Sequence, residues 1–424
     1  MSNKSFNNIF KGDKVIWVIF MFLCLISIIE VYSASSSLSY KTGIYWSPIL
    51  DHVKFLFIGL CTTIIFMNIP CKYFKWLIPI SLGLAFILLI VLLSSGDSIN
   101  GSKRWIEILG IKFQPSEIAK GGLIVFTANA LSAMQTEKGI DKKAFKYILI
   151  VVIPFILLIL PENFSTAALI FATIFIMMYI GLVPIKQLKK LFLCIVLIIG
   201  IAVTTIMLLG DDKKTDNTKQ NLTEETASLN KEDKNIITKF FHRIDTWKQR
   251  IINFTNNEKV DPKDYDLNKN AQIGHANIAI ASSKLIGKGP GNSTERDFLS
   301  QAFSDFIYAI IIEEMGLWGA AGVALLYIFL LFHTSKIANR CENSFPAFLS
   351  MGITLLFVIQ AIFNMAVAVG LGPITGQPLP LISKGGTSTI INCMYIGILL
   401  SISRFAKQRN NIKQRNKNSF INKD

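Results

Sequence analysis

Ten long apolar runs constrain this chain more than any other feature of its sequence. Runs of about 20 apolar residues match the length that an α-helix needs to cross a membrane. With 51% hydrophobic residues and a mean hydropathy of +0.47, the 424-residue chain is too apolar for a soluble protein. The sequence therefore predicts an all-α integral membrane protein, a polytopic bundle of about ten transmembrane helices with one long extracytoplasmic loop. The predicted spans are residues 15–34, 52–69, 74–94, 115–134, 147–162, 165–183, 189–209, 305–333, 347–371 and 388–404.

The distribution of Lys and Arg predicts the orientation of these spans, because short loops rich in these residues stay in the cytoplasm. With both termini inside, the cytoplasmic segments carry 21 Lys and Arg residues and the short outer loops carry five. Topology then explains most of the net charge of +15, which argues against a nucleic-acid-binding face. The predicted organisation is a cytoplasmic N-terminus (1–14), seven spans (15–209), an outer loop (210–304), three spans (305–404) and a basic cytoplasmic tail (405–424).

The long outer loop changes in composition along its length. Residues 211–235 hold almost no large apolar side chains, so they cannot bury enough surface to offset chain entropy, and we expect disorder there. Residues 236–254 place apolar side chains at helical spacing, with basic residues including Arg250 beside them. This pattern predicts an amphipathic helix in the outer membrane interface, or alternatively a soluble helix packed on its own loop.

Asp305 lies where the outer loop turns into the eighth span. An ionisable group at that position often marks a substrate path, a proton relay or a catalytic site. The alternative is an N-terminal helix cap, because a carboxylate there accepts hydrogen bonds from unpaired backbone N–H groups. Glu313 and Glu314 lie about 12 to 14 Å deeper along a helix, too far to act on the same bond. We expect them to be structural and to pair with groups such as Lys120.

Three basic or glycine-rich segments are predicted on the same outer side as Asp305, at residues 101–120, 287–293 and 372–388. Their convergence near one carboxylate suggests a substrate that is anionic and embedded in the membrane, such as a lipid-linked pyrophosphate sugar. Transfer of that sugar needs one base and a cationic clamp. The candidate substrate-binding residues are Arg104, Lys112, Gln114, Glu117, Lys120, Arg250, Gln272, Lys288, Asn292, Ser383 and Lys384.

Simpler roles remain open for several of these residues. Arg104 and Lys112 could anchor their loop to lipid phosphates. Glu117 and Lys120 are three residues apart on a helix and could form an ordinary intramembrane ion pair. Lys384 could be a solvated loop charge. Asn364, in the ninth span, is expected to serve helix packing and loop shape.

The four histidines are scattered and lack the spacing that a zinc site requires. We therefore predict no protein-ligated transition metal.

Six longer motifs together resemble the SEDS family, the polymerases of bacterial shape, elongation, division and sporulation. They span nearly the whole chain, and within the family the chain resembles the division branch in its Bacteroidetes form. It departs from many relatives at Phe303-Ser304, where His-Thr is frequent, and at Lys384, where Tyr is frequent. The motifs are SKRWIEILGIKFQPSEIAK (102–120), PENFSTA (161–167), RIDTWKQRIINF (243–254), GKGPGNS (287–293), AFSDFIYAIIIEEMGLWGA (302–320) and NMAVAVGLGPITGQPLPLISKGGTS (364–388).

The resemblance implies a peptidoglycan glycosyltransferase that joins lipid II units on the outer face of the cytoplasmic membrane, at the division septum. The family's essential aspartate corresponds to Asp305, with the proposed role of general base. Lys112, Glu117 and Lys120 correspond to functionally important polar residues of the fourth span. The family further implies a divalent cation (Mg²⁺ or Mn²⁺) at the substrate pyrophosphate, no organic cofactor, and a partner class B penicillin-binding protein, the transpeptidase FtsI, with other divisome proteins.

Three other functions stay open at this point. A bundle with internal charges could flip the lipid-linked precursor, although no inverted repeat is visible. The bundle could instead be a scaffold that activates a partner transpeptidase. A polymerase of the elongation branch is the alternative within the same class.

Overall fold

The computed structural model describes residues 11–35, 47–95, 97–99, 102–108, 111–136, 139–209, 271–299 and 302–421. The chain forms two compact units, Met1–Gln187 with Leu267–Asp424, and Leu188–Asp266. The segments predicted to be disordered (211–235) and interfacial (236–254, with Arg250) lie outside the described residues, so both predictions stay untested.

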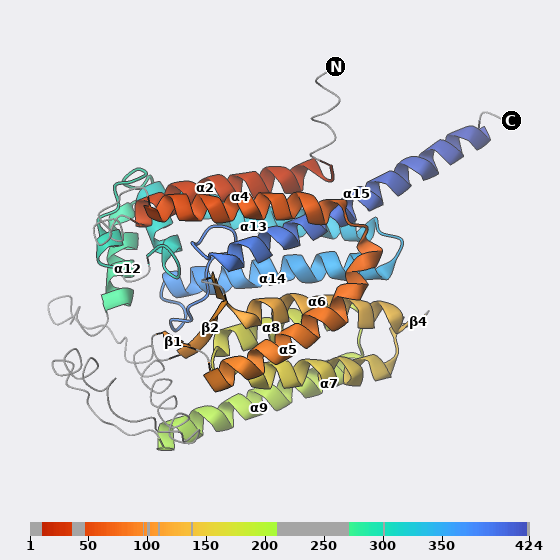
Figure 1. The fold of residues 1–424 in the computed structure, drawn as a ribbon, viewed down its shortest axis with the longest axis horizontal. Coiled ribbons are helices and arrows are strands. Elements are labelled where there is room, and N and C mark those ends of the chain that lie inside the picture. Colours follow the sequence, from red (N-terminus) through yellow and green to blue (C-terminus); the bar gives the residue numbers. More distant parts are fainter. Residues whose placement is uncertain are drawn as a thin grey trace. The chain divides into compact units, whose positions relative to one another are not determined.

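Each of the ten predicted spans corresponds to a helix (Figure 1). Six helices of the described segments are long and apolar enough to cross a membrane. The chain is therefore a helical membrane protein, as the apolar runs predict. The ten helices are α2 (Lys14–Ala34), α4 (Ser47–Asn68), α5 (Leu77–Ser95), α6 (Pro115–Ala133), α7 (Lys142–Ile159), α8 (Phe164–Ile180), α9 (Ile185–Leu209), α13 (Ile307–Asn339), α14 (Ser344–Ala368) and α15 (Thr387–Ile421).

Helix α14 lies at the centre of the first unit. It packs against α13, α6, α8 and α15, and 72% of its most apolar stretch is buried. The side chains that it buries are mostly Leu, Ile, Val and Phe, which is typical of a helix surrounded by other helices. Around it, α2 packs on α13 and α4, α15 packs on α4, and α5 and α7 pack on α6. In Figure 1 these helices run roughly side by side.

Short elements cover the two ends of these helices. At one end lie β1 (Asp97–Ile99), β2 (Ser102–Ile108) and β3 (Ile111–Phe113), which form an antiparallel sheet in the order β1-β2-β3, with α12 (Ala271–Ser283) and η2 (Glu295–Asp297). At the other end lie η1 (Cys71–Trp76), which joins α4 to α5, and the hairpin of β4 (Gln135–Thr136) with β5 (Gly139–Ile140). The first of these ends carries the segments that the sequence predicts to converge.

Helix α13 is broken near its start. Gly316 has φ +70° and ψ −172°, which is far from helical geometry and accessible mainly to glycine. The break removes the helical partners of the preceding carbonyl groups. The carbonyl oxygens of Glu313 and Glu314 accept hydrogen bonds from the backbone N–H groups of Lys288 and Gly289 instead, at 2.9 and 2.8 Å.

Candidate functional site

Asp305 lies two residues before the first residue of α13 and is half-buried. The N-cap residue of this helix is Phe306, which makes no side-chain cap hydrogen bond, so Asp305 is not itself the N-cap residue. Its Oδ1 accepts a hydrogen bond from the Ser304 hydroxyl at 3.0 Å. Its backbone carbonyl accepts one from the Asn364 amide on α14 at 2.9 Å, which fixes the chain direction at this point.

The side chains of Arg104 of β2 and Asp305 both approach Gly376. A Cβ placed on Gly376 would lie 2.9 Å from Arg104 Nη1 and 3.5 Å from Asp305 Oδ2, so both charged groups border the same small space. Gly376 also has φ +68°, where other residues are strained. Arg104 Nε donates to the carbonyl of Glu162 at 3.1 Å, just before α8. Segments that are far apart in the sequence thus place a guanidinium and a carboxylate around one glycine.

The loop that contains Gly376 is held by two amide side chains of α14. Gln360 donates to the Pro378 carbonyl at 2.9 Å, and Asn364 donates to the Gln377 carbonyl at 2.8 Å. The two residues are four apart and therefore lie on the same face of the helix. The expectation that Asn364 shapes this loop is confirmed.

The start of α8 holds the same loop from another side. Gln377 Nε2 donates to the Thr166 hydroxyl at 2.9 Å and lies 3.4 Å from Asn163 Oδ1. The Ser165 hydroxyl donates to the Thr375 carbonyl at 3.1 Å. Asn163 is also the N-cap of α8, since its side chain accepts from the Thr166 N–H. Several of these groups are buried, so water does not compete for the hydrogen bonds that hold the loop.

Ser383 and Lys384 fasten the end of the loop to the residues before Asp305. The Ser383 hydroxyl donates to the Ser304 carbonyl at 2.6 Å, and the Lys384 N–H donates to the Phe303 carbonyl at 3.0 Å. Lys384 Nζ also lies 5.5 Å from the centre of the Phe303 ring. The loop end at Lys384 and the segment that leads into Asp305 are therefore in direct contact. Burial lowers the pKa of Lys384, while the negative charge of Asp51 opposes that shift, so Lys384 is not a fully solvated loop charge.

Lys120 forms a buried ion pair with Glu117. Their charged atoms are 2.7 Å apart, and the side chains are 1% and 5% exposed. Lys120 Nζ also lies 3.3 Å from Gln360 Oε1, so the pair connects through Gln360 to the loop at Pro378. The ordinary intramembrane pair that the spacing predicts is confirmed. Lys112 is exposed on β3, and its carbonyl accepts from the Thr387 hydroxyl at the start of α15.

Replacing Lys120 with Ala should destabilise the protein strongly. The change leaves Glu117 as an uncompensated buried carboxylate, for which the expected loss is about 3–5 kcal/mol of unfolding free energy. Thermal unfolding in detergent would measure it. Lys54→Ala is the matched control, because Lys54 and Asp51 are also three apart but are 70% and 55% exposed, and such pairs contribute less than about 1 kcal/mol. Equal losses in both variants would contradict a structural role for the buried pair.

The expected pairing of Glu313 and Glu314 with Lys120 is wrong. Both are fully buried, and their partners come from the loop of residues 288–296. Glu313 Oε1 lies 2.5 Å from Lys288 Nζ and accepts from the Thr294 hydroxyl and N–H. Lys288, one of the candidate substrate-binding residues, has contacts with Glu313 and Thr294 at 2.5 and 2.8 Å.

Glu314 connects the same loop to α2. It accepts from the N–H groups of Gly291 and Ser293 at 2.9 and 3.2 Å, and from the Ser33 hydroxyl. Arg296 Nη1 donates to Ser33 and to the Gly291 carbonyl, at 3.0 and 2.8 Å. The loop of residues 288–296 is therefore fixed to the break in α13. The pairing joins residues about 20 positions apart, and helical spacing carries no signal for it.

The remaining candidates lie apart from Asp305 or make few contacts. Asn292 is exposed and donates to the Lys288 carbonyl at 3.1 Å. Gln114 is the N-cap of α6 without a side-chain cap bond, and Gln272 is half-buried in α12. Arg250 lies outside the described residues. The structure thus brings Arg104, Ser383 and Lys384 to the Asp305 segment, and connects the Glu117–Lys120 pair to it through Gln360.

Sequence reasoning missed two groups at this site, Gln360 and Gln377. Gln360 lies in an apolar run four residues before Asn364, and that spacing of two amides in a span was a usable signal. Gln377 follows a glycine in a loop, where the sequence alone gives no direction for its side chain.

Gly376→Ala should reduce activity at this site. The added Cβ would approach Arg104 Nη1 to 2.9 Å at a backbone angle that disfavours alanine, so the guanidinium must shift from its position beside Gly376. The expected loss of turnover is about ten-fold or more, as small displacements of catalytic groups commonly produce. Gly372→Ala in the same loop is the control, because its Cβ would meet only Val367 Cγ2, at 3.9 Å. Turnover by both variants at the wild-type rate would contradict the placement of Arg104.

Comparison with known proteins places these features in one family. A family model described as "Cell cycle protein", which covers the FtsW, RodA and SpoVE proteins, matches residues 13–408. A probable peptidoglycan glycosyltransferase FtsW from Coxiella burnetii is 29% identical over 397 residues, covering 91% of this chain and 95% of the relative. A protein of the same description from Geobacter sp. strain M18 is 28% identical over 398 residues, covering 92% and 96%.

Solved structures share the fold. A chain from a structure described as "Structural coordination of polymerization and crosslinking by a peptidoglycan synthase complex" superposes with a TM-score of 0.69 at 21% identity, covering 94% of this chain and 99% of that one. The rod shape determining protein RodA of Thermus thermophilus gives a TM-score of 0.60 at 19% identity, covering 94% and 98%.

Proposed function

The chain belongs to the FtsW/RodA/SpoVE family of cell cycle proteins, and we propose that it is a peptidoglycan glycosyltransferase that polymerises lipid II during cell division. Curated relatives of nearly the same length carry that activity in their names. The observation that most supports the proposal is that the Arg104 guanidinium and the Asp305 carboxylate both border Gly376, at the end of the bundle where the predicted outer segments meet.

Asp305 acts as the general base in this reaction. Its carboxylate accepts the proton of the acceptor sugar hydroxyl as that oxygen attacks the anomeric carbon of the donor. The bond between the anomeric carbon and the pyrophosphate oxygen breaks, and undecaprenyl pyrophosphate leaves with the bonding electrons. The hydrogen bond from Ser304 and the anchoring of the Asp305 carbonyl by Asn364 hold the carboxylate in one orientation.

Cationic side chains near Asp305 suit the pyrophosphate leaving group. Arg104 presents a planar guanidinium, which binds phosphate oxygens in pairs, and Lys384 lies on the adjoining backbone segment. Both would neutralise the negative charge that develops as the leaving group departs. Lys112 lies at the rim on β3 and would contact substrate outside this centre.

A divalent cation, Mg²⁺ or Mn²⁺, would supply further charge neutralisation at the pyrophosphate. Across the part of the chain that the structure describes, no group of three or more His, Cys, Asp and Glu side chains could hold a metal ion. We therefore propose that the cation is bound mainly by the substrate and by solvent. The steps assigned to Asp305 and Arg104 do not depend on its position.

The reaction takes place at the outer face of the cytoplasmic membrane at the division septum, with a transpeptidase partner. The distribution of Lys and Arg supports cytoplasmic termini and an outer site. A structural neighbour couples polymerization and crosslinking in one synthase complex, which supports a class B penicillin-binding protein such as FtsI as the partner. A role in elongation is the alternative within the same family.

An assay of the reconstituted protein separates polymerase from transporter and scaffold. Labelled lipid II is supplied to vesicles that contain the protein and its cognate transpeptidase, and both glycan chain length and label translocation are measured. We expect glycan strands without translocation. Translocation without polymer would identify a transporter, and polymer formation that requires only the partner would identify a scaffold. Either result would reject the proposed function.

A further inference from the structure

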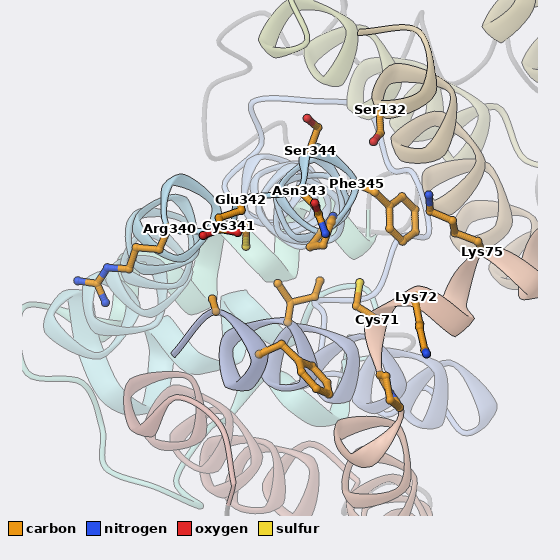
Figure 2. A pocket seen from close by; sticks show the side chains of 15 residues that line it. Cys71, Lys72, Lys75, Ser132, Arg340, Cys341, Glu342, Asn343, Ser344 and Phe345 are labelled. Carbon is orange, nitrogen blue, oxygen red and sulfur yellow. The ribbon is translucent and has the colours of Figure 1, made fainter. Parts of the chain in front are cut away.

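A second hollow lies at the opposite end of the bundle from Asp305. The part of helix α13 beyond the break at Gly316, residues 317–339, is by itself about 35 Å long, and the hollow lies at its far end. It has a volume of about 890 Å³ and is formed by η1, the end of α6, the turn between α13 and α14, and α15 (Figure 2). The lining residues that carry the argument are Lys72, Lys75, Arg340, Phe345, Ile402 and Phe405.

The charge on this pocket is predominantly positive. Lys72 and Lys75 border it on one side and Arg340 on the other, where its guanidinium points away from the hollow, and Glu342 is the acidic residue of the lining (Figure 2). Lys75 Nζ lies 4.8 Å from the centre of the Phe345 ring and Lys72 Nζ 4.9 Å from that of Tyr73. Within the described segments, these three cations form no ion pair with a carboxylate. The pocket therefore presents positive charge that the protein leaves available for a ligand.

The depth of the pocket in the membrane follows from aromatic residues on the same short helix. Tyr73 and Trp76 of η1 are 50% and 75% exposed. In a membrane protein, exposed Tyr and Trp beside Lys mark the level of the lipid headgroups. The apolar side chains of Phe345, Ile402 and Phe405 suit the glycerol and acyl portions of a lipid next to its charged group.

We propose that this pocket binds the headgroup of an anionic phospholipid. The phosphate contacts Lys72 and Lys75, Arg340 adds attraction from the opposite side, and the start of the acyl chains contacts the apolar lining. Basic pockets between transmembrane helices are suited to this chemistry, because each cation adds attraction where water is scarce. The bound lipid would join the α4–α5 turn to the α13–α14 turn, which are far apart in the sequence.

Native mass spectrometry tests the proposal on the full-length protein released from vesicles of phosphatidylglycerol mixed with phosphatidylcholine. The wild type should retain phosphatidylglycerol in preference to phosphatidylcholine. The triple variant Lys72→Gln, Lys75→Gln, Arg340→Gln should bind phosphatidylglycerol at least about 25-fold more weakly, since each of the two contacting lysines is worth about five-fold. Lys72→Gln and Lys75→Gln alone should each lose about five-fold, which keeps the test usable if the triple variant unfolds.

The matched control removes the same charge from another place at the same end of the bundle. Lys142→Gln, Lys143→Gln, Lys146→Gln changes three exposed lysines of α7 that do not line the pocket, and should keep wild-type binding. Equal losses in both triple variants, or equal retention of the two lipids by the wild type, would overturn the proposal. Displacement of phosphatidylglycerol by micromolar inorganic phosphate would also overturn it, by identifying a site for a soluble anion.

Discussion

Asp305→Asn should lower the rate of lipid II polymerisation by about 10² to 10⁴-fold, the range over which a general base contributes. The amide keeps the size of the side chain and can still face Ser304, but it cannot accept the sugar proton. Lipid II binding should change by less than about two-fold, because the proposed contacts to pyrophosphate come from Arg104 and Lys384. The measurement is the polymerisation rate at saturating lipid II beside a binding titration.

Asp297→Asn is the matched control. Asp297 is an exposed carboxylate of η2, eight residues before Asp305, and the same change there should leave the rate unaltered. If the Asp305 variant binds lipid II more weakly but polymerises it at the wild-type rate at saturation, Asp305 would be assigned to substrate recognition. Wild-type turnover by the Asp305 variant would contradict its role as the base.

Gly287→Ala should prevent the loop of residues 288–296 from docking at the break in α13. A Cβ on Gly287 would lie 2.3 Å from the Glu314 carbonyl oxygen and 2.4 Å from the Gly316 nitrogen, and these are backbone atoms that cannot move aside cheaply. Without docking, the buried Glu313 and Glu314 lose Lys288 and several N–H donors. Leaving such groups unpaired costs several kcal/mol in total, so we expect little folded protein or a large drop in the thermal unfolding temperature.

Gly291→Ala provides the comparison for this prediction. Gly291 also has a positive φ, +82°, but nothing lies within 4 Å of its added Cβ. Alanine there should lose only the conformational advantage of glycine, about 1–2 kcal/mol. The two variants thus share the backbone strain and differ in the steric clash. Similar unfolding temperatures for both would contradict the close packing of Gly287 against Gly316.

The helices of this protein could be predicted from the sequence because each apolar run must satisfy its backbone hydrogen bonds internally. The Glu117–Lys120 pair was readable as well, since residues three apart share a helix face. The break at Gly316 was not, because a lone glycine within a helical pattern is usually tolerated. The partners of Glu313 and Glu314 depend on that break, which explains why the expected pairing with Lys120 was wrong.

The candidate site was predictable in part. Asp305 stood out because it lies where the polar outer loop turns into an apolar run, and Arg104 because it lies in a segment expected on the same side. Their meeting at Gly376 was not readable, since it depends on how Gln360 and Asn364 of α14 fix the intervening loop. These amides make long-range contacts to backbone carbonyls, which have no sequence pattern of their own.

The most direct test of Asp305 as the base counts both products of one turnover. Rapid mixing of the purified complex with labelled lipid II would follow glycosidic bonds and released undecaprenyl pyrophosphate together, for the wild type and Asp305→Asn at equal folded amounts. The wild type should release one undecaprenyl pyrophosphate for each bond formed, and the variant should produce neither on the same timescale. Equal formation of both products by the two proteins would contradict the assignment of Asp305.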